Sequence, residues 1–479
     1  MSQAKTPWYR ELNRYHWFVL TVAALGWLFD TMDQQLFTLA RKPAMQELLA
    51  VPAPENETSQ QAEVRKQAFA KNVADYGGYA TSIFLIGWAS GGLAFGVLGD
   101  RIGRARTMLL TILIYSLFTG LSAFSRGFWD FAFYRFLTGL GVGGEFAVGV
   151  ALVAEVMPDT ARPYALGLLQ ALSAVGNITA AVINIALGQM QESGIFGGIE
   201  LFGTKLTAWR LMFVVGTVPA LLALLIRRRL KEPERWQALA NEGGAARQLG
   251  SYGQLFGDAR WRKNAFIGLC LAFSGVVGLW GIGFFAPDLV RSVFTQHFND
   301  LVVDGRHLTH EEVEAKLFLW TGINSIMQNL GGFLGIYAFS IVTHWIGRRS
   351  SFVISFLAAL ASTAFFFWYV DQLSDMFWMT PLMGFCQLAL FGGYAIYFPE
   401  LFPTRLRSTG VSFCYNVGRF IAAVGPYMLA KLTSEVFTKA HGYEREPMRY
   451  AGVVMCCVFL LGLAVLPFAP ETKGRPLPE

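Results

Sequence analysis

The hydrophobic positions of this chain fall in long runs that are separated by polar connections. A run of about 20 apolar residues is the length that crosses a bilayer as a helix. Such runs occupy twelve segments: 17–39, 79–99, 107–125, 127–152, 163–189, 208–226, 264–289, 317–342, 350–370, 376–398, 408–431 and 449–468. The pattern predicts an all-α membrane protein with twelve transmembrane helices.

Three connections are longer than the others. Residues 41–78 and 291–316 are polar and would lie on the outer side of the membrane. Residues 227–263 separate the sixth run from the seventh and are rich in Lys and Arg. We therefore expect two six-helix halves, 1–226 and 264–479, joined by a cytoplasmic linker over 227–263.

Composition and charge distribution support this class. Hydrophobic residues make up 54% of the chain and charged residues 15%, whereas soluble domains carry about 25% charged residues. The formal net charge is +6, and the excess of Lys and Arg lies in segments on the same side as the termini. This asymmetry predicts a multi-pass protein of the cell (inner) membrane with both termini cytoplasmic, in contact with the lipid bilayer and not with nucleic acid.

The chain contains an internal repeat. Glu155 and Glu400 each begin a Glu-x-x-Pro element that is followed by an arginine seven residues after the Glu, at Arg162 and Arg407. The two elements are 245 residues apart, and the Gly-Arg pairs that begin at Gly103 and Gly347 recur at nearly the same offset. The repeat indicates that the two halves share one architecture.

These motifs resemble those of the major facilitator superfamily, whose two halves are parallel repeats. GVLGDRIGRAR at 96–106 is similar to its signature loop, and RFLTGLGVGGE at 135–145 resembles its fourth-span motif. PELFPTRLRSTG at 399–410 and PETKGRPLP at 470–478 resemble the sugar-porter and organic-ion branches. The resemblance implies the major facilitator fold and a secondary transporter that works by alternating access.

The first span, GWLFDTMDQQL at 26–36, places two carboxylates inside an apolar run. Asp30 and Asp33 lie on one helical face, and a charge at that depth costs about 2.5–3.5 kcal/mol on insertion scales. At 1.5 Å per residue, Asp30 and Arg135 lie about 20 and 18 Å from the inner face, so we expect them to form an ion pair. The pair is either proton-linked or purely structural, and Asp33 is either proton-linked or solvated at the cavity mouth.

The first span also resembles the Asp-x-x-Asp element of proton-coupled metabolite symporters, such as the sialate, monocarboxylate and aromatic-acid carriers. The sequence departs from that pattern at Thr31, Met32, Gln34 and Gln35, which leaves the substrate open. We expect Asp30 and Asp33 to be proton-linked with Arg135 as their partner.

Arg419 is a second cation within a span, near the midplane where substrates of this fold bind. A guanidinium can hold a carboxylate through two parallel hydrogen bonds, so Arg419 either contacts an anionic substrate or tethers helices through Asn416. Further candidates for the substrate site, each of which can instead be a packing contact, are Gln34, Gln170, Asn177, Asn324, Gln328, Gln387, Tyr394, Tyr415 and Asn416.

Charged residues also gather at the predicted inner ends of the spans. Their resemblance to the superfamily's motifs implies a cytoplasmic gate of salt bridges formed by Asp100, Arg101, Arg104, Glu155, Arg162, Arg348, Glu400, Arg405 and Arg407. Glu145 either joins this gate or borders the central cavity.

The sequence lacks the Gly-x-x-x-x-Gly-Lys-Ser/Thr phosphate loop and metal-ligand spacing among its six His. We therefore expect a non-enzymatic, monomeric transporter without metal or cofactor, driven by the proton gradient. The predicted function is proton-coupled symport of a small organic anion. A sugar or polyol carrier and a non-transporting sensor on the same fold are the alternatives.

Overall fold

The computed structural model describes the chain except for residues 1–6, 51–57, 194, 197–198, 202, 242–248, 304–305, 309, 423–427, 430, 438–441, 444 and 479. The described residues are predominantly helical. They also form two small antiparallel hairpins, made by β1 (Glu200–Leu201) with β2 (Thr204–Lys205) and by β3 (Val302–Val303) with β4 (Arg306–His307).

The first half of the chain forms one group of helices. They are α1 (Arg14–Leu48), α2 (Ser59–Ile102), α3 (Arg104–Ser122), α4 (Phe128–Val156), α5 (Arg162–Glu192), α6 (Ala208–Val215) and α7 (Ala220–Arg229). The linker region contains α8 (Glu234–Asn241) and α9 (Tyr252–Gly257).

The second half begins with a span that is interrupted. It consists of α10 (Ala259–Val276), a π-helix over Val277–Ile282, a 3₁₀ turn over Gly283–Phe285 and α11 (Ala286–Asn299). The half continues with α12 (His310–Ile346), α13 (Arg348–Tyr369), α14 (Met379–Leu401), α15 (Arg407–Ala422), α17 (Pro447–Met455) and α18 (Val458–Val465).

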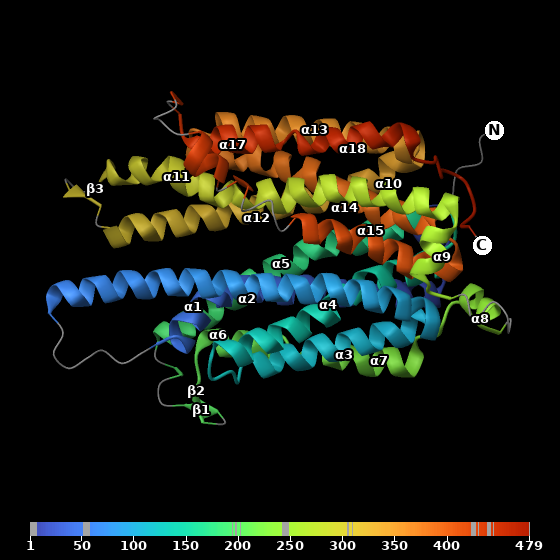
Figure 1. Cartoon of the computed structure of the whole chain (residues 1–479), viewed down its shortest axis with the longest axis horizontal. Helices are drawn as coiled ribbons and strands as arrows, with labels where there is room; N and C mark the ends of the chain where they lie inside the picture. The colour runs from blue at the N-terminus through green and yellow to red at the C-terminus, as the bar shows by residue number, and fades with distance from the viewer. Residues whose placement is uncertain are drawn as a thin grey trace.

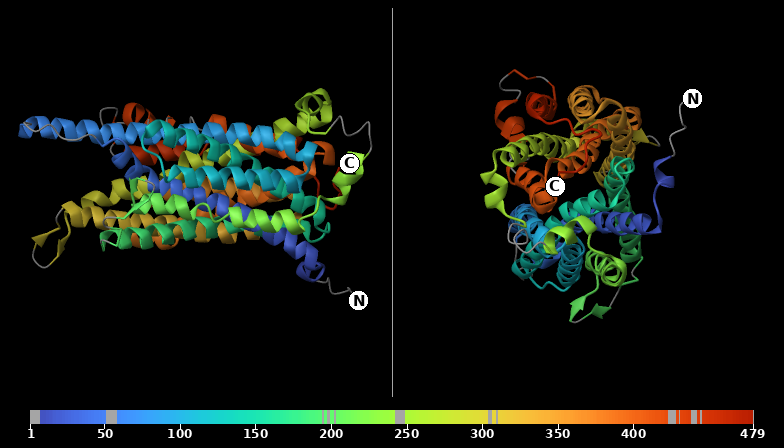
Figure 2. Two further views of the ribbon diagram at one scale, coloured as in Figure 1. Left: turned by 90° about the horizontal axis from the view of Figure 1, so that it is seen from below. Right: turned by 90° about the vertical axis from the view of Figure 1, so that its right-hand side faces the viewer.

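The two halves lie side by side with their helices roughly parallel to the long axis (Figure 1), and the end-on view in Figure 2 shows the helices gathered around that axis. The beginning of α1, the linker helices α8 and α9, and the C-terminal segment share one end of the bundle. We call this end the terminal face. The two hairpins lie toward the opposite end.

The arrangement confirms the predicted twelve spans. Among the described residues, nine helices are long and apolar enough to cross a membrane, and Ala208–Ala223 is a shorter apolar helix. The first span, in α1, is not among these nine because its polar residues lower its hydropathy. The eleventh span is formed by α15 as far as Ala422. Part of that predicted span, residues 423–427 and 430, lies outside the described residues.

Two of the expected long connections are largely helical. Across 41–78, α1 continues to Leu48 and α2 already begins at Ser59. The start of α2 is stabilised by Thr58 and Gln61, whose side chains satisfy each other's backbone N–H groups. Across 291–316, α11 and α12 extend to either side of the β3–β4 hairpin. The helices therefore extend beyond their apolar cores.

Glycines bring α2 and α4 into direct backbone contact. A Cβ at Gly143 would overlap the backbone carbonyl of Trp88, and one at Gly139 would overlap that of Phe84. Close approach of this kind is how small residues pack helices in membranes.

We expect Gly143→Ala to destabilise the protein by roughly 1–3 kcal/mol, because an added methyl group forces apart two tightly packed backbones. Gly149 on the same helix is the matched control, since a Cβ there meets nothing within 4 Å. Thermal unfolding of the purified protein in detergent measures the effect. Equal melting temperatures for Gly143→Ala and Gly149→Ala would contradict this account of the packing.

Candidate functional site: a central cavity and its buried charges

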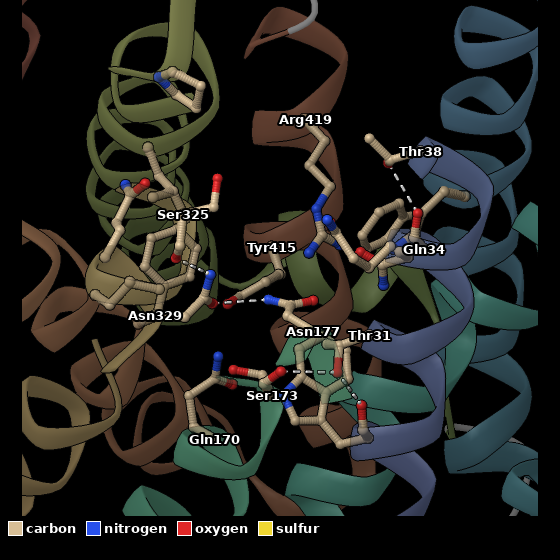
Figure 3. Close-up of a pocket in the computed structure, with 18 residues that line it drawn as sticks. Thr31, Gln34, Thr38, Gln170, Ser173, Asn177, Ser325, Asn329, Tyr415 and Arg419 are labelled. Atoms are coloured by element: carbon tan, nitrogen blue, oxygen red, sulfur yellow. Dashed lines mark hydrogen bonds between the residues drawn. The ribbon is translucent and has the colours of Figure 1, made fainter. Parts of the chain in front are cut away.

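A cavity of about 280 Å³ lies between the two halves. We call it the central cavity. Its walls come from α1, α2 and α5 on one side and from the interrupted seventh span, α12, α14 and α15 on the other. Figure 3 shows Gln34 of α1 and Arg419 of α15 next to each other at this junction. Six carboxamide side chains line the cavity: Gln34, Gln35, Gln170, Asn177, Gln328 and Asn329.

The structure divides the predicted substrate-site residues into two groups. Those that line the central cavity are Arg419, Gln34, Gln170, Asn177, Gln328 and Tyr415. The other four make packing contacts away from its walls. Asn324 accepts a hydrogen bond from Thr380 (2.9 Å), the Tyr394 hydroxyl donates to the Leu271 carbonyl (2.6 Å), Gln387 donates to Thr363 (2.8 Å), and Asn416 donates to the Ser412 carbonyl (3.0 Å).

Arg419 is held in place by an aromatic cage and one hydrogen bond. Its guanidinium carbon lies 3.9 Å from the ring centroid of Trp88 and 4.7 Å from that of Tyr415. One terminal nitrogen donates to the Asn416 side-chain oxygen at 2.9 Å. Its Nε has no partner among the described residues. Both residues lie on α15, so this hydrogen bond does not tether two helices, and Arg419 presents positive charge to the central cavity.

The expected Asp30–Arg135 ion pair is wrong, because Arg135 pairs with Asp33. The Arg135 Nη2 lies 3.0 Å from the Asp33 Oδ2, and Thr119 donates to the other Asp33 oxygen at 2.8 Å. Phe37 and two further phenylalanine rings surround the guanidinium, the nearest with its centroid at 4.6 Å. Both charged side chains are fully buried. Asp33 is therefore not solvated at a cavity mouth.

Asp30 and Glu145 form a second buried acidic site. Both side chains are almost completely buried, and Gln34, one turn after Asp30 on α1, is placed to donate to the Asp30 carboxylate. Glu145 packs against Gly26, one helical turn before Asp30, in space that a side chain at Gly26 would occupy. Glu145 therefore lies beside the first-span carboxylates and not in the gate.

The terminal face is closed by contacts that cross between the halves. The Asp100 carboxylate accepts hydrogen bonds from the backbone N–H groups of Ser408 (3.1 Å) and Thr409 (2.9 Å) at the start of α15. Arg407 reaches Glu155 of the first half at 2.6 Å. Arg104 donates to the Thr404 carbonyl at 2.6 Å and pairs with Asp100 and Glu155 within its own half. A carboxylate at a helix N-terminus is favourably placed for the helix dipole.

The remaining predicted gate residues support these contacts within one half or through the linker. Arg348 binds Glu400 through two hydrogen bonds of 2.7 and 3.1 Å, and Arg162 pairs with Asp159. Arg101 donates to the linker carbonyls of residues 249 and 250, and the Arg405 carbonyl accepts from the N–H of residue 250.

The internal repeat is visible in two glutamates at this face. Glu232 accepts hydrogen bonds from the first N–H groups of α3, and Glu471 accepts from those of α13. Partial burial acts to raise the pKa of Glu471, but hydrogen bonds from the N–H groups of residues 348, 473, 349 and 472 outweigh it and hold this pKa below its ordinary value.

The family model for the Major Facilitator Superfamily matches residues 24–426. The chain belongs to the major facilitator superfamily. A putative metabolite transport protein of Haemophilus influenzae is 28% identical over 98% of this chain and 99% of that protein. The niacin transporter NiaP of Acinetobacter baylyi is 24% identical over 97% and 96% of the two chains. Among solved structures, the proton:xylose symporter XylE aligns with a TM-score of 0.69 at 17% identity, covering 97% of this chain and 98% of that one.

Sequence reasoning missed several residues of this transporter's central cavity. Ser325 and Asn329 lie one turn apart on α12 and flank the predicted Gln328, and Asn329 accepts a hydrogen bond from Asn177 at 3.0 Å. Their polar side chains in an otherwise apolar span could have identified them from the sequence. Trp88 and Phe391 also line the cavity, but an aromatic residue in an apolar span carries no signal that separates a cavity wall from a lipid-facing or packed position.

We expect Asp100→Asn to open the terminal face of this transporter, because the variant loses the charge that holds the start of α15. Hydrogen bonds to charged groups contribute about 1.5–3 kcal/mol each, so losing one shifts the closed-to-open ratio at least about tenfold. Spin labels at the exposed Arg106 and Arg260, one in each half, report the separation by pulsed electron resonance. Glu234→Gln, which removes an exposed acid in α8, is the control. An unchanged distance distribution in Asp100→Asn would contradict this role.

Proposed function

We propose that this protein is a proton-coupled symporter for a small organic anion. One observation carries the proposal. A cavity-lining arginine, Arg419, lies next to Gln34 of α1, one helical turn after the buried carboxylate of Asp30. An anion bound at Arg419 and a proton bound at Asp30 therefore affect each other's affinity.

The coupling works through charge neutralisation. Without substrate, the guanidinium of Arg419 favours the ionised form of Asp30, since a nearby positive charge favours a carboxylate. An anion bound to Arg419 cancels that effect, so Asp30 takes up a proton more readily. By linkage, a proton on Asp30 strengthens anion binding by the same factor. Anion and proton then bind together and leave together.

The charge balance of the interior supports a ratio of one proton per anion. Three buried carboxylates, Asp30, Asp33 and Glu145, share the N-terminal half with Arg135, and Arg419 faces them from the other half. Two cations neutralise two of the carboxylates. Because an isolated buried charge is strongly unfavourable, one proton shared by Asp30 and Glu145 completes the balance without substrate, and an anion bound at Arg419 requires one further proton.

Transport would proceed by rocking of the two halves around the central cavity. The contacts of Asp100 and Arg407 close the terminal face, which we place in the cytoplasm from the excess of Lys and Arg in segments on that side. Breaking these contacts would release substrate and proton to the inside. We propose that a monomer in the cell (inner) membrane does this with no cofactor, using the proton gradient as its energy source.

A sugar or polyol carrier is the second candidate, and the six cavity carboxamides favour it, because amides can donate to and accept from hydroxyl groups. The arginine on the wall distinguishes the two candidates. A neutral sugar would form no ion pair with this guanidinium, whereas an organic anion would.

Uptake into proteoliposomes of purified protein tests the proposed substrate class. The panel contains nicotinate, lactate, sialate, xylose and an organic amine, each with an inward proton gradient. We expect accumulation of at least one acid, and its uptake should be inhibited by other carboxylates more than by xylose. Accumulation of xylose alone would establish the sugar carrier, and accumulation of the amine would contradict both candidates. Binding without accumulation would favour a sensor.

A further inference from the structure

Two contacts between the halves occupy equivalent positions of the internal repeat at the terminal face. One joins Asp100, near the end of α2, to Thr409, near the start of α15. With the repeat offsets, Asp100 corresponds to His344 and Thr409 corresponds to Tyr164. His344 of α12 and Tyr164 of α5 also meet across the halves, with ring centroids 5.5 Å apart and planes at 42°. The terminal face therefore has two repeat-related contacts, one charged and one aromatic.

The aromatic contact has a third member from the N-terminal part of the chain. Trp8 stacks on the Tyr164 ring, with centroids 5.7 Å apart and an angle of 7° between the planes. Trp8 begins a 3₁₀ turn that precedes α1, and its ring centroid also lies 6.1 Å from that of Trp17 in the first turn of α1. Aromatic rings with centroids about 4.5–7 Å apart attract each other. Trp8 thus joins the beginnings of α1 and α5, and Tyr164 contacts the second half.

Three further contacts fix residues 7–13, which we call the N-terminal strap, to the first half. The Glu11 carboxylate accepts a hydrogen bond from Thr160 in the turn before α5. Leu12 is buried in the hydrophobic core. Asn13 caps α1, because its side-chain oxygen accepts from the backbone N–H three residues later at 2.8 Å. The strap is therefore an ordered part of the closed terminal face, attached to both α1 and the start of α5.

The repeat shows a related arrangement beside the charged contact. Asn13, the cap of α1, corresponds to Asp258, the cap of α10, so the strap corresponds to the linker helix α9. Phe256 of α9 packs against Phe413 of α15 with ring centroids 5.0 Å apart. Tyr252 of α9 donates to a backbone carbonyl of α2 at 3.0 Å. Each contact between the halves thus lies beside the segment that precedes the first span of one half.

We propose that the N-terminal strap stabilises the closed terminal face by holding Tyr164 against His344. These two residues belong to opposite halves, so their contact breaks when the face opens. Trp8 stacks on the Tyr164 ring and restricts its rotamers, which reduces the side-chain entropy that Tyr164 loses on contact with His344. Trp8 is thus a positioning residue that acts through Tyr164. This conformational control goes beyond the proposed function and holds for any substrate of the central cavity.

Distance measurements on the full-length protein in phosphatidylcholine nanodiscs test this role. Spin labels at the exposed Arg106 and Arg260, one in each half, report the opening of the terminal face by pulsed electron resonance. Trp8→Ala removes the stack, whereas Trp8→Phe keeps an aromatic ring against Tyr164. Trp129→Ala is the matched control, because it removes an exposed tryptophan at the start of α4, outside the strap.

We expect Trp8→Ala to raise the ratio of open to closed molecules about two- to tenfold, which is the effect of one aromatic contact on an equilibrium constant. Trp8→Phe should give a smaller increase, and Trp129→Ala should leave the distances as in wild type. An unchanged distance distribution in Trp8→Ala would overturn the proposal, as would equal shifts in Trp8→Ala and Trp129→Ala.

A double-mutant cycle distinguishes action through Tyr164 from a general loosening of the N-terminal strap. Tyr164→Ala removes both ring contacts, so adding Trp8→Ala to it should cause no further opening. Tyr164→Phe keeps both ring contacts and should behave like wild type. If Trp8→Ala opened the face equally with and without Tyr164, the proposed positioning role would be wrong. Because the readout is conformation, these results do not depend on whether the transported substrate is an organic anion.

Discussion

Replacing Arg135 by leucine should destabilise the protein by about 3–5 kcal/mol and abolish transport, because it leaves Asp33 buried without its cation. Both side chains are fully buried and 3.0 Å apart, and within the described part of the chain only Thr119 would remain as a donor to the Asp33 carboxylate. The phenylalanine rings around the guanidinium would lose a cation and gain no polar partner. Thermal unfolding in detergent and uptake into proteoliposomes measure the two effects.

A double variant separates the fold from the function of this pair. Asp33→Leu/Arg135→Leu removes both charges, and replacing a buried ion pair by apolar residues is often neutral or stabilising. We expect its melting temperature to return close to that of wild type while transport stays lost. If the double variant regained transport, the pair would be a structural tether only. If Arg135→Leu alone kept wild-type stability, the buried pair itself would be in doubt.

Truncating Arg419 to alanine should raise the apparent KM for an anionic substrate roughly 100-fold, equivalent to about 2.7 kcal/mol. Losing one partner of a buried charge pair costs about 2–5 kcal/mol, and Arg419 is the arginine on the wall of the central cavity. Arg419→Lys keeps the positive charge but loses the planar guanidinium, so its KM should lie between those of wild type and Arg419→Ala. Initial uptake rates over a range of substrate concentrations measure this effect.

Asn416→Ala is the matched control for the Arg419 prediction. It removes the 2.9 Å hydrogen bond between the two side chains but leaves the guanidinium and its contacts with Trp88 and Tyr415. We expect its KM to change less than fivefold. Equal losses in Asn416→Ala and Arg419→Ala would mean that the arginine acts through its hydrogen bond with Asn416 and does not bind substrate.

The sequence was sufficient to predict the spans and several of the charged residues that form ion pairs at the terminal face. Apolar length alone predicts the helices, and the offset between Glu155 and Glu400 identifies equivalent positions in the two halves. The sequence did not predict which acid pairs with Arg135. Depth along ideal helices resolves positions to about one turn, and Asp30 and Asp33 differ by less than one turn. A third residue, Thr119 of α3, binds Asp33 as well, and no linear pattern indicates that contact.

The location of the Glu145 side chain also could not be predicted without the three-dimensional packing. Its sequence position near the middle of α4 is compatible with the gate and with the cavity. In the structure it occupies the space beside Gly26, on the helix that carries Asp30. Four predicted polar residues do not line the central cavity. Asn324, Gln387 and Tyr394 hydrogen-bond to neighbouring helices, and Asn416 bonds within α15, contacts that composition cannot indicate.

The measurement that tests the central claim most directly is the pH change that substrate evokes in proteoliposomes, with wild type, Asp30→Asn and the control Glu234→Gln compared. A pH electrode records the external medium after addition of the acid that accumulates in the uptake panel. We expect alkalinisation of this medium for wild type and Glu234→Gln. Asp30→Asn should show no pH change but should still exchange labelled for unlabelled substrate. Equal alkalinisation by Asp30→Asn, or uptake by wild type without any pH change, would contradict proton coupling at Asp30.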